Sequence, residues 1–180
     1  EHPNTKLTIQ AQAYYTGQPN IQVSYPGYVG PSAAECVAEG TCTITADHGL
    51  NLGNIVLGSV GTARLTIRNT AECAPNPSIN ACDSCALSLK ADPARQNIGL
   101  GFKAGTNDQN FFSFNGSTRL PADIRQKNLS ADCNAQGEMS VLLNFTAPTT
   151  EGAYSTTVVV ESNDPDAPLI EIPISATALN

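Results

Sequence analysis

The sequence has no tryptophan, one methionine and few basic residues. Nine Lys and Arg residues stand against sixteen Asp and Glu residues, and the formal net charge is −7. Proteins that bind nucleic acid neutralise phosphates with clustered Lys and Arg, so we expect no nucleic-acid partner. Anionic membrane surfaces attract basic segments in the same way. No stretch approaches the run of about 18 apolar residues that a membrane-spanning helix needs, so we expect no membrane insertion.

Catalytic motifs are also missing. The two histidines are His2 and His48, and neither lies near a nucleophile motif such as G-x-S-x-G. His48 follows Asp47 and could in principle belong to a Ser-His-Asp relay. Its turn-like context, Ala-Asp-His-Gly, favours a surface residue instead. We therefore predict a protein that is not an enzyme and that needs no cofactor.

Two acidic loops offer oxygen atoms of the kind that Ca²⁺ takes as ligands. One contains Asn163, Asp164 and Asp166, and the other is Asn107-Asp108-Gln109-Asn110. Neither has the spacing of an EF-hand or an RTX repeat, and Asp-Pro turns are common without metal. We predict no metal site, and calcium binding is kept as a minor alternative.

Six cysteines lie in segments rich in Pro, Asn and Asp: Cys36, Cys42, Cys73, Cys82, Cys85 and Cys133. An even number of loop cysteines predicts three disulfides and an oxidising compartment. Cys82-Asp-Ser-Cys85 has the spacing of a zinc knuckle or a redox motif, but no second knuckle and no helix start accompany it. Spacing alone does not fix the connectivity. We expect Cys36 with Cys42, Cys73 with Cys82, and Cys85 with Cys133.

The rest of the chain predicts short strands and tight turns, with 41% hydrophobic residues for a core and with 14 Gly and 12 Pro. In residues 139–145, Met139, Val141, Leu143 and Phe145 share one face, which predicts a central strand. Two insertions, Pro31 to Thr41 and Ala71 to Ser84, are too short to be domains. The expected strands cover residues 7–15, 21–25, 42–45, 50–57, 63–69, 86–90, 98–102, 111–114, 138–145, 154–161 and 169–179.

The last two of these strands predict an antiparallel hairpin. Ile170, Ile172, Ile174, Ala176 and Ala178 alternate with polar residues, and the segment SNDPDAP (162–168) supplies a turn. Pro173 lacks an N–H group, so we expect the last strand at a sheet edge, or the ring side of Pro173 facing solvent.

This last hairpin resembles the end of ASH (abnormal spindle and hydin) immunoglobulin-like domains and of the related bacterial choice-of-anchor D modules, and residues 50–70 are similar to their early strands. The resemblance rests on VVVESNDPDAPLIEIPISATA (158–178) and on LNLGNIVLGSVGTARLTIRNT (50–70). Leu52-Gly53 replaces the usual Phe-Gly, and cysteine-bearing insertions separate the strands. The resemblance implies an all-β immunoglobulin-like β-sandwich over residues 19–180 and brings no catalytic motif with it.

We expect residues 1–18 to form an N-terminal extension that precedes the sandwich domain. In Thr5 to Tyr15 the apolar side chains of Leu7, Ile9, Ala11, Ala13 and Tyr15 alternate with polar ones, which predicts a strand, and Thr16 to Asn20 has the composition of a hinge. The strand can add to the sandwich of its own chain. Alternatively, it can add to a neighbouring copy, as in fimbrial subunits, and a head-to-tail contact of this kind builds a filament.

The predicted function follows from these features. The sequence begins at Glu1 without a charged n-region or an apolar h-region, so we expect an exported chain whose secretion signal has been removed. We expect an extracellular structural subunit of a surface fibre that self-associates through residues 7–15. The alternative is a monomeric secreted or periplasmic binding or adhesion module.

Overall fold

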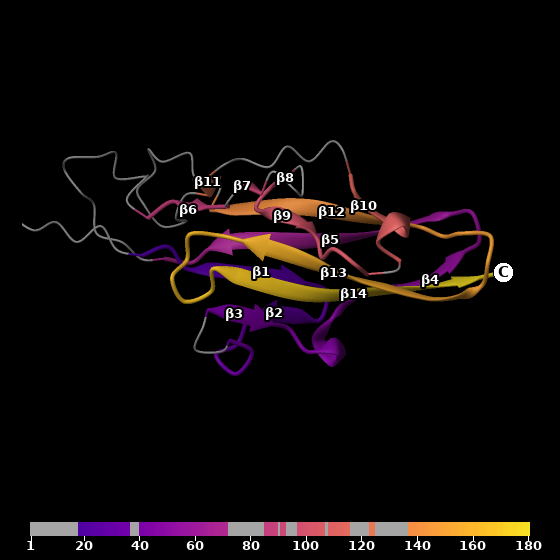
Figure 1. The fold of residues 1–180 in the computed structure, drawn as a ribbon, viewed down its shortest axis with the longest axis horizontal. Helices are drawn as coiled ribbons and strands as arrows, with labels where there is room; N and C mark the ends of the chain where they lie inside the picture. The colour runs from indigo at the N-terminus through magenta and orange to yellow at the C-terminus, as the bar shows by residue number, and fades with distance from the viewer. Residues whose placement is uncertain are drawn as a thin grey trace, which may run out of the picture.

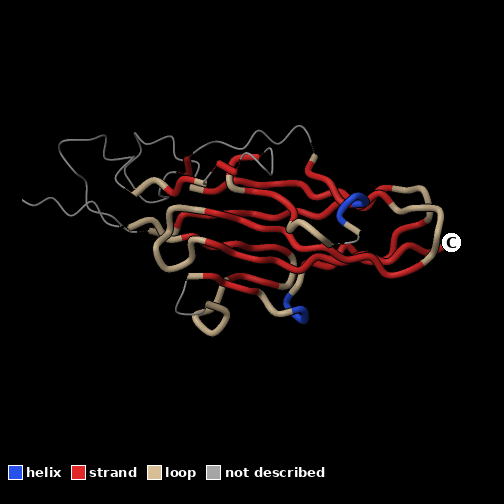
Figure 2. Tube along the Cα trace, viewed as in Figure 1, coloured by secondary structure: helices blue, strands red, loops and turns tan. Residues whose placement is uncertain are grey.

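The computed structural model describes residues 18–36, 40–71, 85–89, 91–92, 97–106, 108–115, 123–124 and 137–180. Strands dominate these residues (Figure 2), and two single turns of 3₁₀ helix, η1 (Ala46–His48) and η3 (Gln109–Phe111), lie between them. None of the helices in the described ranges has the length and hydropathy needed to cross a membrane.

Two sheets form a β-sandwich, as the sequence predicts. The first has the strand order β10-β12-β5-β1-β2, and the second has the order β3-β14-β13-β9, with β4 also paired to β14. Figure 1 shows the long strands β5, β12, β13 and β14 running along the molecule. The first sheet contains β1 (Ile21–Tyr25), β2 (Tyr28–Gly30), β5 (Val60–Asn69), β10 (Phe112–Phe114) and β12 (Glu138–Thr146).

The second sheet contains β3 (Thr41–Thr43), β4 (Leu50–Val56), β9 (Leu100–Phe102), β13 (Gly152–Glu161) and β14 (Leu169–Leu179). Two small pairs accompany the sandwich: β6 (Leu87–Ser88) with β11 (Asp123–Ile124), and β7 (Ala91–Asp92) with β8 (Asn97–Ile98). The strands predicted within the described residues are thus found with small shifts at their ends, and the strand predicted over residues 7–15 lies outside them. The short strands β2, β7 and β11 were not predicted.

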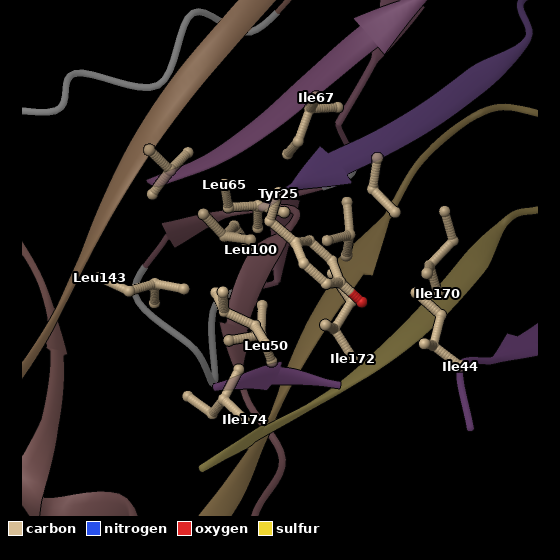
Figure 3. Close-up of a cluster of buried hydrophobic side chains, with 14 of the residues drawn as sticks. Tyr25, Ile44, Leu50, Leu65, Ile67, Leu100, Leu143, Ile170, Ile172 and Ile174 are labelled. Atoms are coloured by element: carbon tan, nitrogen blue, oxygen red, sulfur yellow. The ribbon is translucent and has the colours of Figure 1, made fainter. Parts of the chain in front are cut away.

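The core lies between the sheets and is built from the alternating faces. In β12, Met139 is 6% exposed, while Val141, Leu143 and Phe145 are fully buried, and the strand lies between β10 and β5. In Figure 3, Leu65, Ile67 and Leu143 of the first sheet lie opposite Leu100, Ile172 and Ile174 of the second. The predicted central strand is therefore confirmed.

The last hairpin is also confirmed, with Glu161 paired to Leu169 and Gly152 paired to Ala178. On β14, the alternating residues Ile170, Ile172, Ile174, Ala176 and Ala178 are each at most 1% exposed. The strand has β13 on one side and β3 followed by β4 on the other. The predicted edge position for this strand is therefore wrong.

Pro173 is accommodated because the neighbour of β14 changes at that residue. The pairing with β3 ends at Glu171, whose carbonyl accepts the N–H of Ile44 at 2.9 Å, and the pairing with β4 begins at Ile174. Backbone groups two residues apart point to the same side of a strand, so the nitrogen of Pro173 points towards β3 and β4, as the Glu171 carbonyl does. The connection from β3 to β4, which contains η1, passes close to Pro173, since a Cβ on Gly49 would lie 2.9 Å from the Pro173 carbonyl oxygen. The missing N–H therefore falls where no ladder bond is needed.

Candidate functional site

The predicted subunit-interaction residues, Leu7, Ile9, Ala11, Ala13 and Tyr15, lie outside the described residues. The strand expected over residues 7–15 stays a prediction. The described chain begins at Gln18 and enters β1 at Ile21. The Asn20 carbonyl accepts the N–H of Thr70 at 2.8 Å, which fixes the start of β1 beside the end of β5.

The disulfide between Cys36 and Cys42 confirms one predicted pair. It closes the end of the first insertion onto β3, where the Thr43 N–H also donates to the Glu35 carbonyl at 2.9 Å. Cys85 is disulfide-bonded as well. Cys73, Cys82 and Cys133 lie outside the described residues, so the other two predicted pairs stay predictions.

The carboxylate of Glu35 lies at the centre of a polar cluster at this side of the sandwich. Its Oε2 accepts hydrogen bonds from the Tyr28 hydroxyl at 2.6 Å, the Ser32 N–H at 2.8 Å and the Ser32 hydroxyl at 2.7 Å. Its Oε1 lies 3.3 Å from Nδ1 of His48. The Tyr25 hydroxyl donates to the His48 carbonyl at 2.8 Å. We call Tyr25, Tyr28, Ser32, Glu35 and His48 the Glu35 cluster.

These hydrogen bonds set the ionisation of the cluster. Burial raises the pKa of Glu35, but the hydrogen bonds from Tyr28, Ser32 and His48 outweigh it and lower the pKa to about 2. Burial is the main cause that raises the pKa of Tyr28, and its hydrogen bond to Glu35 adds to the effect. Burial also raises the pKa of Tyr25, with a smaller contribution from the negative charge of Glu35. Glu35 is thus an anion and the two tyrosines are neutral donors at physiological pH.

The Glu35 cluster ties together segments that belong to different sheets. Tyr25 and Tyr28 come from the β1–β2 hairpin of the first sheet, and His48 comes from η1, which connects β3 and β4 of the second. Rings of Tyr25 and Tyr28 stack with centroids 5.0 Å apart, and Tyr28 lies 5.4 Å from the His48 ring. These contacts link the two sheets at the side of the sandwich where β2 and β3 are the edge strands.

His48 lies at the surface, as expected, with its side chain 54% exposed. Its Nε2 is 3.9 Å from Asp47 Oδ2, and its other ring nitrogen faces Glu35. Neither Glu35 nor Tyr28 was predicted as a functional residue. The one available signal was the Ser32-x-x-Glu35 spacing, which allows a carboxylate to reach back to a backbone N–H three residues earlier.

The opposite side of the sandwich is closed by aromatic residues. Phe102 of β9 stacks on Phe114 of β10 with centroids 4.5 Å apart, which joins an edge strand of the second sheet to an edge strand of the first. The rings of Phe111 and Tyr154 pack in a T-shaped arrangement with their centroids 5.1 Å apart. Both long sides of the sandwich therefore carry contacts between the sheets.

A hollow of about 580 Å³ lies beside β13 and β14 of the second sheet, lined by residues that include Thr106, Asp108, Ser155 and Ser175. Its polar groups bond to each other. Asp108 Oδ2 accepts the Ser155 N–H at 2.9 Å, and the hydroxyls of Thr106 and Thr156 are 2.6 Å apart. These bonds hold Thr106 and Asp108 against β13.

The acidic turn between β13 and β14 has a structural role. Asp164 is 3% exposed, and its carboxylate accepts the N–H groups of Ile21, Asp166 and Ala167. Within the described ranges, no three His, Cys, Asp or Glu residues are grouped as a metal ion would require.

The chain is similar to known proteins in structure only. No family model and no curated protein matches the sequence. A protein of unknown function from Porphyromonas gingivalis is similar with a TM-score of 0.47 and 12% identity, over 92% of this chain and 50% of that one. The ASH/PapD-like domain 7 of human CEP192 is similar with a TM-score of 0.39 and 11% identity, over 100% of this chain and 99% of that one.

The CupB6 tip adhesin of Pseudomonas aeruginosa is similar with a TM-score of 0.37 and 11% identity, over 81% of this chain and 44% of that one. The chain spans half the length of the Porphyromonas gingivalis protein. At these TM-scores the similarities carry no argument about function. The sandwich assignment rests on the strand pairing.

Proposed function

We propose that the chain is an extracellular structural subunit that assembles head to tail, with the strand expected over residues 7–15 added to a sheet of a neighbouring copy. The observation that carries this proposal is that the described strands from β1 to β14 pair into two sheets around one buried apolar core. An alternating apolar strand that precedes such a core needs another surface to cover its apolar face.

The position of β14 distinguishes this chain from a subunit that lacks a core strand. In strand-addition assemblies of the fimbrial kind a strand from a partner completes a sheet. Here the position between β13 and the β3–β4 side is filled by β14 of the same chain, and its apolar face is fully buried. The added strand would therefore extend a sheet edge, and no missing core strand would be replaced.

The disulfides support the extracellular setting. Cys36–Cys42 and the disulfide of Cys85 persist in oxidising compartments and are rare where thiols are kept reduced. A fibre outside the cell works without chaperones, and covalent loop closure slows its loss by unfolding.

Electron microscopy of the negatively stained full-length chain, together with sedimentation velocity, tests the proposal. We expect filaments whose length grows with protein concentration. Ile9→Asp would place a charge on the apolar face of the strand and should leave monomers. Gln10→Asp puts the same charge on the polar face one residue away, and this matched control should still form filaments.

Other results would overturn the proposal. A wild-type chain that stays monomeric at high concentration would favour the monomeric binding or adhesion module. A monomer whose melting temperature falls with Ile9→Asp but not with Gln10→Asp would show that the strand pairs within its own chain. Filaments formed equally by both variants would exclude residues 7–15 from assembly.

A further inference from the structure

Strand β5 is paired along its whole length on one side and along less than half on the other. β12 pairs with β5 from Val60 to Arg68, whereas β1 pairs with it only from Thr66 to Asn69. In the part of the chain that the structure describes, no strand pairs with residues 60–65 on the β1 side. We call this stretch the β5 edge.

The hydrogen-bond pattern shows which backbone groups face outward at the β5 edge. The Thr70 N–H donates to Asn20 on the β1 side, and the Ser59 carbonyl accepts from Ala147 on the β12 side. Backbone groups alternate between the two sides along a strand, so even-numbered residues face the β1 side. The N–H and C=O of Thr62 and Arg64 therefore point to the β5 edge.

Proline ends the β1 ladder at this point. The register that pairs Val23 with Ile67 places Pro26 opposite Arg64 when it is continued. Pro26 has no N–H to donate, and the chain turns there into β2. The β5 edge is thus left open by the sequence of β1 and is regular enough to accept another strand.

The neighbouring edge of β4 is less suited to pairing. Gly53 has a positive φ of 80°, and the register with β14 shifts between Ser175 and Thr177. The Gly53 N–H is already bonded to Asn51 Oδ1 at 2.8 Å. Bulges of this kind disrupt the regular row of donors and acceptors that an incoming strand requires.

Exposed apolar side chains occur on the outer faces of both sheets at this end of the sandwich. Val56 is 61% exposed, Val60 57% and Leu179 39%, which are three of the four exposed large apolar side chains among the described residues. Val56 pairs with Leu179, and its carbonyl accepts the Ser59 N–H in the turn that leads to Val60. Figure 1 places this end of the sandwich, with β4 and the C-terminus, far from the start of β1.

We propose that the β5 edge is the acceptor for residues 7–15 of a second copy of this chain. This inference rests on the proposed function and names the surface that it uses. The occupant offers what the edge lacks, which is backbone groups for Thr62 and Arg64, and its alternate apolar side chains can pack beside the exposed side chain of Val60.

The distances along the chain favour a second copy over the same chain. Asn20 lies opposite Thr70, and Thr62 is eight residues along β5 from Thr70, about 27 Å away. Tyr15, five residues before Asn20, reaches at most about 18 Å, and Gln12, eight residues before Asn20, reaches about 29 Å only when the chain is straight. Of the expected strand, only residues 7–11 could therefore lie opposite Thr62 of their own chain with any slack. The β1–β2 hairpin also occupies the direct route. A neighbouring copy has neither constraint.

Complementation between full-length variants tests the acceptor. Thr62→Pro removes the outward N–H of Thr62 and leaves the β12 ladder intact, because that ladder uses the odd-numbered residues. Thr62→Val keeps the N–H and the shape and loses only the hydroxyl bond to Asn144. We expect Thr62→Pro to remain monomeric and Thr62→Val to form filaments like the wild type.

The decisive sample is an equimolar mixture of Ile9→Asp, which keeps its acceptor, with Thr62→Pro, which keeps its donor strand. We expect a single heterodimer in sedimentation velocity and no longer species, with each variant alone monomeric. Val60→Lys serves as a second acceptor variant should Thr62→Pro lose its circular dichroism spectrum, because Val60 is exposed and a lysine there opposes edge pairing.

The outcomes separate the two proposals. If the wild type forms no filaments, the proposed function fails. If the wild type forms filaments and the folded acceptor variants assemble equally well, the function stands and the β5 edge is the wrong acceptor. If a folded acceptor variant is monomeric and does not pair with Ile9→Asp, the β5 edge is also the wrong acceptor.

Discussion

The carboxylate of Asp164 accepts the backbone N–H of Ile21 at 2.7 Å, which joins two residues 143 positions apart. The bond fixes the first residue of β1 to the turn between β13 and β14. It also determines where the N-terminal extension leaves the sandwich.

Replacing Asp164 by alanine should therefore destabilise the fold. The buried carboxylate accepts three backbone N–H groups, and its loss leaves them without a partner at a cost of about 2 to 4 kcal/mol in the free energy of unfolding. Urea denaturation measures this cost. Asp166→Ala, two residues away at an exposed position, is the control and should change stability by less than about 0.5 kcal/mol. Equal effects of the two substitutions would mean that the Asp164 bonds contribute nothing particular.

Glu35 should give the protein a characteristic acid sensitivity. Its pKa is lowered from 4.5 to about 2 on folding, so its contribution to stability is complete above pH 4.5 and is lost as the pH falls towards 2. A shift of this size corresponds to about 3 kcal/mol. Glu35→Gln should therefore lower the urea midpoint at pH 7 and have almost no effect near pH 2.

The control for Glu35 is Glu138→Gln, which removes an exposed ion pair with Arg68. Pairs of this kind contribute about 0 to 1 kcal/mol, so we expect a small effect. A cost of Glu35→Gln that stays constant from pH 7 to pH 2 would exclude the ionised carboxylate as its cause.

The disulfide Cys36–Cys42 should contribute measurably although its loop is short. The two residues are six positions apart, and closing so small a loop restricts the unfolded chain by about 2 kcal/mol. The double substitution of Cys36 and Cys42 by alanine should lower the free energy of unfolding by this amount in non-reducing urea denaturation. A loss below about 0.5 kcal/mol would mean that the hydrogen bonds of Glu35 and Thr43 already hold the loop.

The long strands could be predicted because their alternation matches their burial. Residues 139–145 of β12 and 170–178 of β14 show a period of two that needs no knowledge of their neighbours. The start of β5 was missed because Gly61 occupies an inward position. A Cβ there would collide with the side chain of Ile55, so the apolar group that fills this site comes from β4.

Other features depend on tertiary contacts that no local pattern encodes. Pro173 favoured an edge position for the last strand, which is wrong, because the change of neighbour from β3 to β4 leaves room for the proline inside the sheet. Glu35 acquires its role from His48, thirteen positions away, and from the fold of the β1–β2 hairpin. The β5 edge follows from the length of β1 relative to β5, which only the register shows.

Adjacent leucines of β12 provide a direct test of the two faces of the first sheet. Leu143 is fully buried in the core, whereas Leu142, paired with Arg64, lies on the outer face and is only half-buried. Leu143→Ala should cost about 2 to 5 kcal/mol through lost burial and the cavity left behind. Leu142→Ala removes the same atoms one residue away and should cost well under half as much, because the site opens to water and leaves no cavity. Thermal and urea unfolding of both variants measure the difference. If the two costs are equal, the facing of β12 is not what its alternation implies.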